Sequence, residues 1–459
     1  MPAARNGRDS TLFFAQALLP GGWARDVRIG VRGGTIAGVE TGARPGPDDE
    51  RHACAVPGLP NVHSHAFQRG MAGLAERRGP AGDSFWTWRD VMYRFVDRVT
   101  PEDLRAIAAL AYVEMLESGF TRVGEFHYLH HDPSGRPYAD RAIMGGAIAA
   151  AAADSGIGLT LLPVFYAHSG FGGAPPRADQ RRFVDDLDGY ARVLEGAARA
   201  VAALPDAVIG IAPHSLRAVS PDALAALDRV AADRPVHIHI AEQIREVTDC
   251  LAWSGQRPVA WLLDHVGVDG RWCLVHATHM TDAEAAAMAR SGAVAGLCPI
   301  TEANLGDGVF PARRFLDAGG RYGIGSDSNV LIDATEELRL LEYGQRLVHR
   351  GRNLLAADTG RSTGADIHAA AVDGGAAALG VTSGLAVGVA ADIVSLDLRH
   401  PSLAGRAIDS VLDGLIFAAG RSGIDCVWRH GARVVSEGRH HAREQVVQDY
   451  VATMEKLTA

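Results

Sequence analysis

The sequence has few cysteines and no close pair of them. Its five cysteines are scattered over 459 residues, and none stands in a Cys-x-x-Cys arrangement. This spacing argues against a thiolate metal cluster or a dithiol redox centre. An odd number of separated thiols fits a reducing cytoplasm, where they stay free and mostly buried. The five are Cys54, Cys250, Cys273, Cys298 and Cys426.

The chain also lacks an excess of basic residues. It has 45 Lys and Arg against 54 Asp and Glu, a formal net charge of −9. Proteins that bind nucleic acids usually carry a basic face, so we expect no nucleic-acid partner. A small anionic substrate remains compatible with this charge, because a site can be locally positive in an acidic protein. Lysine is nearly absent, and Lys456 is the only one.

Long apolar runs are missing as well. The longest apolar block, 142–153, is too short to span a bilayer and stops at Asp154. The apolar stretch near the N-terminus is interrupted by Gln16 and ends at Pro20, which favours a strand over a signal peptide. We therefore expect no membrane association and a cytoplasmic location. With 47% hydrophobic and 22% charged residues, the chain has the composition of a folded globular protein.

The pattern of apolar and polar residues changes twice along the chain. Residues 25–56 and the region from about 384 onward alternate apolar and polar residues around turn glycines, which predicts β-strands, and 443–457 has the pattern of a terminal helix. Between these ends, short apolar strands alternate with Ala-rich helical segments, the pattern of parallel strands with crossover helices. We predict two domains: a small β-sandwich from 1–57 and 384–459, and an α/β catalytic domain at 58–383.

A doubly wound sheet and a closed barrel both fit the repeated β–α units. No G-x-G-x-x-G opens a helix after the first strand, and no P-loop is present. Polar residues at the ends of several different strands suit a (β/α)8 barrel best, because barrel enzymes place catalytic groups there. These residues are His63, His65, Glu125, His127, His214, His239, Glu242, His276 and Asp327.

Two histidines follow the first barrel strand in "VPGLPNVHSHAF". His63 and His65 face the same way if the strand continues, because side chains alternate along a strand. Two neighbouring neutral imidazoles can bind one metal ion. Alone, an H-x-H pair is a weak signal, and two unrelated polar residues in a loop remain the alternative.

A second alternation occurs in "PVHIHIAEQ". His239 would end its strand at the barrel mouth, with Glu242 just beyond it and within reach of a metal-bound water. A carboxylate near a helix N-terminus that complements the helix dipole is the structural alternative for Glu242. His237 shares a face with His239 one layer deeper, and we interpret it as a core or supporting histidine.

Two further strand ends carry ionisable groups. His276 terminates the apolar strand of "LVHATH", whereas His279 lies in the following turn and is interpreted as structural. Asp327 ends the strand of "YGIGSDSNV", where Gly323 and Gly325 leave room for close neighbours. Taken alone, Asp327 is better explained as a cap of the next helix.

The order of these motifs is more specific than any one of them. H-x-H, then H-x-x-E, then a strand-end His and a strand-end Asp resembles the amidohydrolase superfamily. Within it, the fragments "PGLPNVHSHAFQRGMAGL", "FWTWRDVMY", "GEFHYLHH", "PHSLRAV", "HIHIAEQ", "LVHATH" and "GIGSDSNV" resemble the formiminoglutamate deiminases of bacterial histidine degradation. The fragments span residues 57–330. The segments around Gln68, Arg89 and Tyr128 point to this group rather than to deaminases in general.

The resemblance implies a metal site and a reaction. His63, His65, His239 and Asp327 would hold one Zn²⁺ per chain, with room left for a water. Asp327 would accept a proton from that water as it attacks the formimino carbon of N-formimino-L-glutamate. His276 would stabilise the tetrahedral centre, and Glu242 would protonate the departing nitrogen. The products are ammonia and N-formyl-L-glutamate.

A substrate with two carboxylates needs local cations. Arg89 and Arg217 are the candidates, because a guanidinium binds a carboxylate through two hydrogen bonds. Gln68, Tyr128 and His214 would add neutral hydrogen bonds. The alternatives are a surface ion pair of Arg89 with a nearby aspartate and a solvated helix-end charge for Arg217.

Other functions stay open at this stage. A deaminase of the same superfamily acting on guanine or an adenosine derivative would use the same zinc set, but in a pocket with aromatic stacking and few arginines. An amidase and a non-catalytic barrel protein are further alternatives. The absence of a lysine at the barrel strand ends favours a mononuclear site, and the superfamily resemblance implies a homodimer. Glu125, His130 and His131 have no assigned role.

Overall fold

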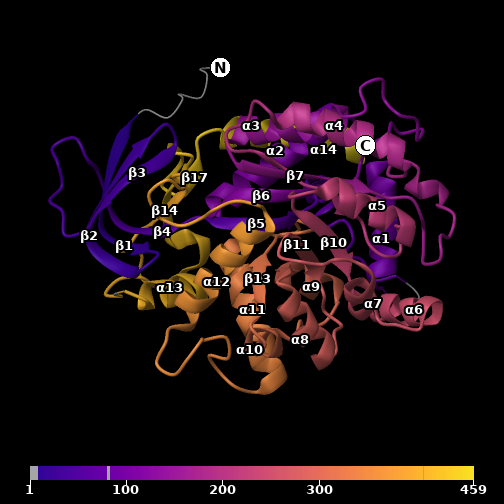
Figure 1. Ribbon diagram of the computed structural model, residues 1–459. Coiled ribbons are helices and arrows are strands. Elements are labelled where there is room, and N and C mark those ends of the chain that lie inside the picture. The colour runs from indigo at the N-terminus through magenta and orange to yellow at the C-terminus, as the bar shows by residue number, and fades with distance from the viewer. Residues whose placement is uncertain (1–8, 80–82, 407) are drawn as a thin grey trace.

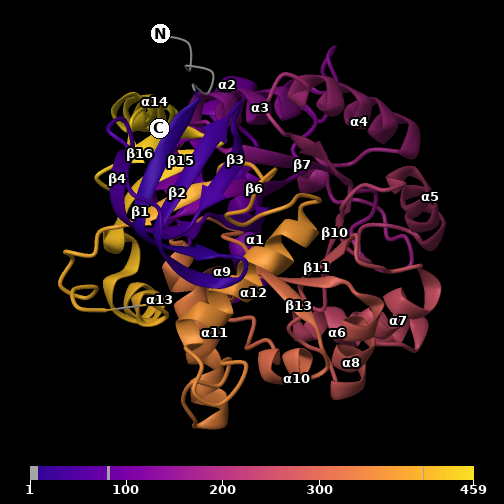
Figure 2. The same ribbon diagram turned by 60° about the vertical axis from the view of Figure 1, so that its left-hand side comes forward.

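The structure is a computed structural model that describes residues 9–79, 83–406 and 408–459. It consists of a barrel of strands and helices and a smaller β domain beside it, as Figure 1 shows. Both ends of the chain contribute strands to the β domain, so the indigo and the yellow segments lie together in Figure 2. The α/β fold class and the pairing of the chain ends are as predicted from the sequence.

The β domain is built on one mixed sheet of eight strands. The N-terminal strands β1 and β2 form a long antiparallel hairpin, and β1 also pairs in parallel with β4. The C-terminal β14 then pairs antiparallel with β4, and this contact joins the two ends of the chain. In sheet order the strands are β17 (Arg439–His440), β16 (Ala432–Ser436), β15 (Ile424–Arg429), β14 (Ile393–Leu396), β4 (Glu50–Pro57), β1 (Ser10–Leu19), β2 (Gly22–Arg32) and β3 (Thr35–Glu40).

The barrel strands are all parallel. Bridges from Ile211 to Val236 and from Ser215 to His239 join the two edges of the sheet and close it, with the short β8 and β9 together filling one strand position. Around the barrel the strands are β10 (Val236–Ile240), β11 (Trp272–His276), β12 (Val294–Leu297), β13 (Arg321–Ile324), β5 (Leu59–Ser64), β6 (Phe120–His127), β7 (Gly158–Phe165), β8 (Val208–Ile209) and β9 (Ala212–Pro213).

Helices cover the outside of the barrel. Every residue of β6 and of β7 is buried, as expected for parallel strands packed on both faces. The long α2 begins at Thr100, whose hydroxyl accepts the Asp103 N–H while Pro101 occupies the first turn. The helices are α1 (Phe85–Val96), α2 (Pro101–Glu117), α3 (Ile143–Ser155), α4 (Leu187–Val201), α5 (Pro221–Ala231), α6 (Ile244–Ser254), α7 (Pro258–His265), α8 (Asp282–Ser291), α9 (Pro299–Leu305), α10 (Ala312–Asp317), α11 (Ala334–His349), α12 (Thr363–Ala378), α13 (Ser410–Gly414) and α14 (Arg443–Thr458).

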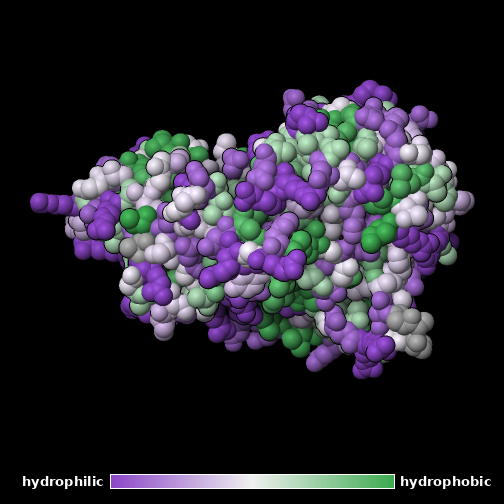
Figure 3. All heavy atoms as spheres, turned by 90° about the horizontal axis from the view of Figure 1, so that it is seen from below, coloured by the Kyte–Doolittle hydropathy of each residue, from purple (hydrophilic) through white to green (hydrophobic). Residues whose placement is uncertain are grey.

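The C-terminal helix α14 starts at the predicted residue but packs on the barrel. Lys456 Nζ lies 2.8 Å from both carboxylate oxygens of Asp103 on α2. Although α14 comes from the C-terminal part of the chain, it packs on a barrel helix. The limits of 58–383 for the catalytic domain stay a prediction. Figure 3 shows a larger and a smaller lobe, with hydrophilic residues spread over both and interrupted by small apolar groups.

Two glycines allow the close packing at the end of β13. A Cβ on Gly325 would lie 2.8 Å from the carbonyl oxygen of His63, and one on Gly323 would clash with a methyl carbon of Val62. The absence of side chains at these positions lets β13 lie directly against β5. None of the helices in the described ranges is long and apolar enough to cross a membrane.

Candidate active site

Four predicted metal ligands meet at the carboxyl ends of the barrel strands. His63 lies on β5 and His65 directly after it, whereas His239 lies on β10. The Nε2 atom of His63 is 3.2 Å from Nε2 of His65 and 3.0 Å from Nε2 of His239. Oδ1 of Asp327 is 3.5 Å from His63 Nε2 and 3.4 Å from His65 Nε2. Side chains from three separate strand ends thus present one donor atom each to a common point.

Hydrogen bonds to the main chain orient two of these imidazoles. His65 Nδ1 lies 2.9 Å from the Phe126 carbonyl oxygen, and His239 Nδ1 lies 3.1 Å from that of His214. A carbonyl can only accept, so each Nδ1 carries the proton and each Nε2 keeps its lone pair. This is the arrangement in which outer hydrogen bonds orient metal-binding histidines.

The donor set fits a divalent metal. Two atoms bound tetrahedrally at about 2.0–2.1 Å from Zn²⁺ lie roughly 3.3 Å apart, close to the distances seen here. Burial, together with the neighbouring His65, lowers the pKa of His63 to about 3. Burial also lowers the pKa values of His65 and His239. The neutral imidazole is the form that binds metal, and Asp327, whose pKa lies well below its usual range, supplies the negative charge.

The other two predicted catalytic residues, Glu242 and His276, lie beside this cluster, and His276 is next to Asp327. His276 Nε2 is 3.7 Å from Asp327 Oδ2 and 3.8 Å from Glu242 Oε1. Burial raises the pKa of Glu242 to about 7, against the opposing attraction of His276 and Arg217. Although burial disfavours its charge, the surrounding carboxylates raise the pKa of His276 to about 10. A carboxyl group with a pKa near neutral pH, beside a cationic imidazole, can exchange protons with a reacting group.

Two of these residues have unusual backbone conformations. His276 has φ of 67° and Asp327 has φ of 42°, in the left-handed region that non-glycine residues seldom occupy. His276 is the last residue of β11, and Asp327 lies three residues after the end of β13. Strained residues of this kind are concentrated at functional sites, because the surrounding structure must hold them in place.

All five predicted substrate-binding residues line one small cavity together with His65, His239 and Asp327. The cavity of about 60 Å³ is lined by Gln68, Arg89, Tyr128, His214 and Arg217 together with His65, His239, Glu242, His276 and Asp327. Gln68 Nε2 donates to the Tyr128 hydroxyl at 3.1 Å, which fixes both side chains. Helix α1 covers the cavity through Phe85, Trp88 and Arg89.

Within the part of the chain that the structure describes, Arg89 forms no ion pair with a nearby aspartate, and Arg217 is not a solvated charge at a helix end. The aspartates near Arg89 pair elsewhere: Arg177 lies 3.4 Å from Asp90, and Arg181 lies 2.8 Å from Asp97. Arg89 itself stacks on a tryptophan ring. The side chain of Arg217 is only 12% exposed and lies 3.7 Å from Glu242 and 3.8 Å from Glu246. Both arginine side chains are half-buried and line the cavity.

Sequence reasoning missed a supporting layer of polar residues. Glu302 on α9 lies 3.3 Å from His276 Nδ1 and also accepts the Cys298 N–H. Asn61 and Asn329 join the ends of β5 and β13: Asn61 accepts the N–H groups of His63 and Ser326, and Asn329 donates to the His65 carbonyl. In the sequence, Glu302 is a carboxylate one helical turn after Cys298 and Pro299, which follow a strand. This spacing does not indicate that Glu302 contacts His276.

The remaining polar residues near the site make local contacts. Glu125 accepts the Ala66 N–H at 2.7 Å and so supports the turn after His65. His130 and His131 lie 2.9 and 2.8 Å from the main-chain carbonyls of Val164 and Val184. His237 is fully buried one layer below His239, with Nε2 2.8 Å from the Ala378 carbonyl. These positions suit supporting roles rather than contact with a substrate.

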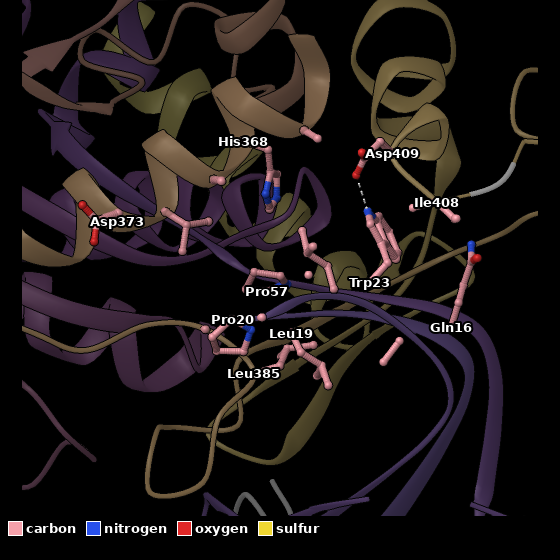
Figure 4. A pocket seen from close by; sticks show the side chains of 18 of the residues that line it. Gln16, Leu19, Pro20, Trp23, Pro57, His368, Asp373, Leu385, Ile408 and Asp409 are labelled. Atoms are coloured by element: carbon pink, nitrogen blue, oxygen red, sulfur yellow. Dashed lines mark hydrogen bonds between the residues drawn. The ribbon is translucent and has the colours of Figure 1, made fainter. Parts of the chain in front are cut away.

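A larger cavity lies away from this chemistry, between the β domain and α12. It measures about 740 Å³, and Figure 4 shows His368 and Trp23 facing it, with Trp23 Nε1 donating to Asp409 at 2.8 Å. Burial lowers the pKa of His368 to about 4. Three of the four cluster residues, His65, His239 and Asp327, line the smaller cavity instead, so the smaller cavity is the candidate active site.

Comparison with known proteins identifies the family. The sequence profile described as "Amidohydrolase family" matches residues 54–434. The chain therefore belongs to the amidohydrolase family, as the order of its motifs indicated. A second profile, "Formimidoylglutamate deiminase HutF, N-terminal domain", matches residues 10–53. Formimidoylglutamate deiminase of Pseudomonas aeruginosa is 51% identical over 98% of this chain and 99% of that protein.

Other relatives and solved structures agree with the fold. A 5-methylthioadenosine/S-adenosylhomocysteine deaminase of Natronomonas pharaonis is 31% identical over 77% of this chain and 75% of its own length. The crystal structure of an amidohydrolase from Brucella melitensis has a TM-score of 0.95 and 56% identity, covering 98% of this chain and all of that one. A zinc-bound adenosine deaminase from Xanthomonas campestris has a TM-score of 0.81 at 24% identity, covers 98% of each chain and shows the shared fold alone.

Proposed function

We propose that the chain is a hydrolase that removes ammonia from N-formimino-L-glutamate and leaves N-formyl-L-glutamate. One observation carries the proposal: two inward-facing arginines, Arg89 and Arg217, line the same cavity as the metal-binding cluster. A substrate with two carboxylates and a hydrolysable imine needs both features. The 51% identity to a formimidoylglutamate deiminase over nearly the whole chain supports this substrate.

We propose that His63, His65, His239 and Asp327 hold one Zn²⁺ per chain. Support comes from the convergence of their donor atoms within 4.8 Å and from the zinc bound by the Xanthomonas campestris adenosine deaminase, which shares the fold. When bound, Zn²⁺ would lower the pKa of a coordinated water toward about 7 and so supply a nucleophile at neutral pH. His₃Asp also accepts other divalent ions, and metal analysis of the purified protein decides between them.

The chain's own residues then handle the protons. Oδ1 of Asp327 faces His63 and His65 and its Oδ2 faces His276, so Asp327 can take a proton from the attacking water. The departing nitrogen needs two protons, and Asp327 would return this proton as the second one when ammonia leaves. His276, cationic and buried, would stabilise the tetrahedral centre by hydrogen bonding to the oxygen that adds to the formimino carbon. Glu242, with a pKa of about 7, can give its proton to the nitrogen that leaves as ammonia.

The two arginines would set the orientation of the substrate. Each guanidinium can hold one carboxylate through paired hydrogen bonds. Gln68, Tyr128 and His214 line the same cavity and would add neutral polar contacts. Fixing both carboxylates places the formimino group at the metal cluster, and positioning of this kind contributes much of an enzyme's rate enhancement.

A purine-type deaminase is the second candidate. The cavity also contains aromatic rings, among them Phe85, Trp88, Tyr128 and Tyr166, that could stack on a base. The resemblance to a methylthioadenosine deaminase at 31% identity supports the same idea. The half-buried side chains of Arg89 and Arg217 favour the dianion, because a neutral base would leave their buried Nε atoms without an acceptor.

The first experiment measures ammonia release by protein of known metal content. N-formimino-L-glutamate is tested beside guanine, adenosine and N-formyl-L-glutamate. We expect ammonia from the formimino compound alone, with one zinc per chain. Ammonia from a purine alone would replace the proposed substrate while keeping the family.

We further propose that the protein acts in the cytoplasm as a homodimer. The five free, buried cysteines support a reducing compartment. The dimer rests on the superfamily resemblance, and sedimentation at several protein concentrations tests it. A monomer at micromolar concentration would contradict it.

A further inference from the structure

A second cavity opens next to the one lined by His65, His239 and Asp327. It measures about 600 Å³ and lies between α1, α6 and the loop that follows β7. Arg89 and Arg217 line both cavities, so the two spaces meet at these guanidinium groups. The inner cavity, about 60 Å³, is far below the roughly 300–1,000 Å³ usual for ligand pockets. A substrate of dicarboxylate size therefore has to use part of the outer space during entry.

The lining of the outer cavity has more arginines than carboxylates, although the chain as a whole is acidic. Its lining includes four arginines, Arg89, Arg177, Arg217 and Arg245, against two aspartates, Asp90 and Asp249. The chain as a whole has a net charge of −9. A positive concavity on a negative molecule attracts small anions to that one place, since walls of low dielectric constant focus the field there.

Trp86 brings two of these cations close to each other. The Cζ atom of Arg89 lies 4.5 Å from the centre of the Trp86 ring, and that of Arg245 lies 4.7 Å from it. The attraction of each cation to the ring helps to hold like charges near one another. Arg245 is 64% exposed and pairs with Asp249 at 3.5 Å, so its charge faces incoming solutes.

Donor atoms remain available where the cavities meet. The Nε atoms of Arg89 and Arg217 are buried and have no hydrogen-bond partner among the described residues. A buried N–H without a partner is unfavourable, and a carboxylate arriving there would satisfy it. The route therefore runs from an exposed cation, Arg245, to two half-buried ones whose buried Nε atoms are free to donate.

We propose that the outer cavity is an entry subsite for small dicarboxylate anions, in which Arg245 makes the first contact and Arg89 and Arg217 receive the carboxylates. This inference rests on the proposed function for the identity of the substrate. It adds a residue, Arg245, that touches neither the metal-binding cluster nor the inner cavity. Its role is to raise the capture of substrate rather than the rate of the chemical step.

The test compares Arg245→Gln and Arg245→Glu with a matched control, Arg313→Gln. Arg313 also forms an exposed i,i+4 pair, with Asp317 on α10. At about 10 mM ionic strength we expect kcat/KM for N-formimino-L-glutamate to fall about threefold to tenfold in R245Q and further in R245E. At about 300 mM the variants should approach the wild type, because salt screens exposed charges. R313Q should match the wild type at both ionic strengths.

A binding measurement separates this inference from the proposed function. Glutarate has two carboxylates and no formimino group, and calorimetry on metal-loaded protein measures its affinity. We expect R245Q to weaken glutarate binding at low but not at high salt. Absence of ammonia release with salt-dependent glutarate binding would refute the substrate and keep the subsite. Equal glutarate affinity in R245Q and R313Q, a loss independent of salt, or no glutarate binding to the wild type would refute the subsite.

Discussion

Glu302 Oε1 lies 3.3 Å from His276 Nδ1, on the side of the imidazole that faces away from the metal-binding cluster. The other ring nitrogen of His276 faces Glu242 and Asp327. Glu302 therefore holds the ring in one orientation and favours its cationic form, in the way that a buried carboxylate supports a catalytic histidine. This relationship joins a residue of α9, missed in the sequence, to one predicted at the end of β11.

Replacing Glu302 by Gln tests this support. Glu302 is among the carboxylates that raise the pKa of His276, so its neutralisation should lower that pKa from about 10. If the cationic imidazole is needed, the alkaline limb of the pH–kcat profile moves to lower pH, by about one unit for each ~1.4 kcal/mol of interaction lost, and kcat falls about tenfold per unit of pH above the new limb. Glu336→Gln on the half-exposed start of α11 is the control. An unchanged alkaline limb in E302Q would contradict the role.

Arg89→Met and Arg217→Met test the two carboxylate-binding positions. Each change removes a guanidinium but keeps an apolar stem of similar length. We expect KM for N-formimino-L-glutamate to rise at least tenfold in each variant, because one charged hydrogen-bonded pair is lost, about 1.5–3 kcal/mol. Zinc content should stay at the wild-type value. Little change in KM with zinc intact would refute the dianionic substrate and favour the purine-type alternative.

His239→Asn tests the metal cluster. The variant loses one imidazole Nε2 from the four converging donor atoms, so zinc per chain should fall well below one after dialysis against a weak chelator. Metal binding stabilises only the folded state, so added zinc should raise the melting temperature of the wild type more than that of the variant. His237→Asn, one layer deeper, is the comparison. Equal zinc retention by H239N and the wild type would exclude His239 as a ligand.

How much of this site could be predicted depended on whether a residue's role is local. His63, His65, His239 and Asp327 were predictable because strand alternation and strand ends fix where they point, and parallel strands bring all such ends to one face. Arg89 on α1 could be proposed only through a family resemblance, since nothing in its helix shows that α1 folds over the barrel mouth. Glu302 and Asn329 were beyond reach, because their partners lie on strands distant in the sequence.

The fold shows the same division. The β–α alternation predicted the barrel, and the alternating ends predicted a β domain. The pairing of β4 with β14, which joins those ends, has no local signature. The packing of α14 on α2, which includes an ion pair between Lys456 and Asp103, has no local signature either. Periodicity predicts the elements, whereas long-range contacts decide which of them are neighbours.

Gly325→Ala tests the close approach of β13 and β5. An added Cβ would lie 2.8 Å from the His63 carbonyl oxygen and 2.9 Å from its nitrogen, both main-chain atoms that cannot move freely. We expect a loss of about 1–3 kcal/mol in the free energy of unfolding, with reduced zinc binding because His63 is displaced. Gly146→Ala on α3 is the control, since a Cβ there meets nothing within 4 Å and alanine favours helix. Full stability and full zinc content in G325A would show that β13 can shift without cost.

His440 gives a pH dependence of stability that is separate from the active site. Its Nε2 lies 2.9 Å from the Ser155 carbonyl and its Nδ1 accepts the Ala442 N–H at 3.0 Å, so the neutral imidazole satisfies both neighbours. Burial lowers the pKa of His440 from 6.5 to about 4. The unfolded chain therefore binds a proton that the folded chain does not, between about pH 6.5 and pH 4. The stabilisation is complete above pH 6.5 and is lost as the pH falls toward 4, by up to about 3 kcal/mol.

Replacing His440 by Gln removes this titration. Urea unfolding at pH 7.5 and pH 5 should show a smaller loss of stability on acidification in H440Q than in the wild type. His349→Gln, at the exposed end of α11, is the control and should lose as much free energy of unfolding as the wild type. Acid affects the metal-binding cluster in both variants, so the difference between H440Q and H349Q does not include that effect. If H440Q and H349Q lose the same free energy between the two pH values, protonation of His440 does not oppose folding, and the Ala442 N–H would have to find another acceptor when the imidazole is charged.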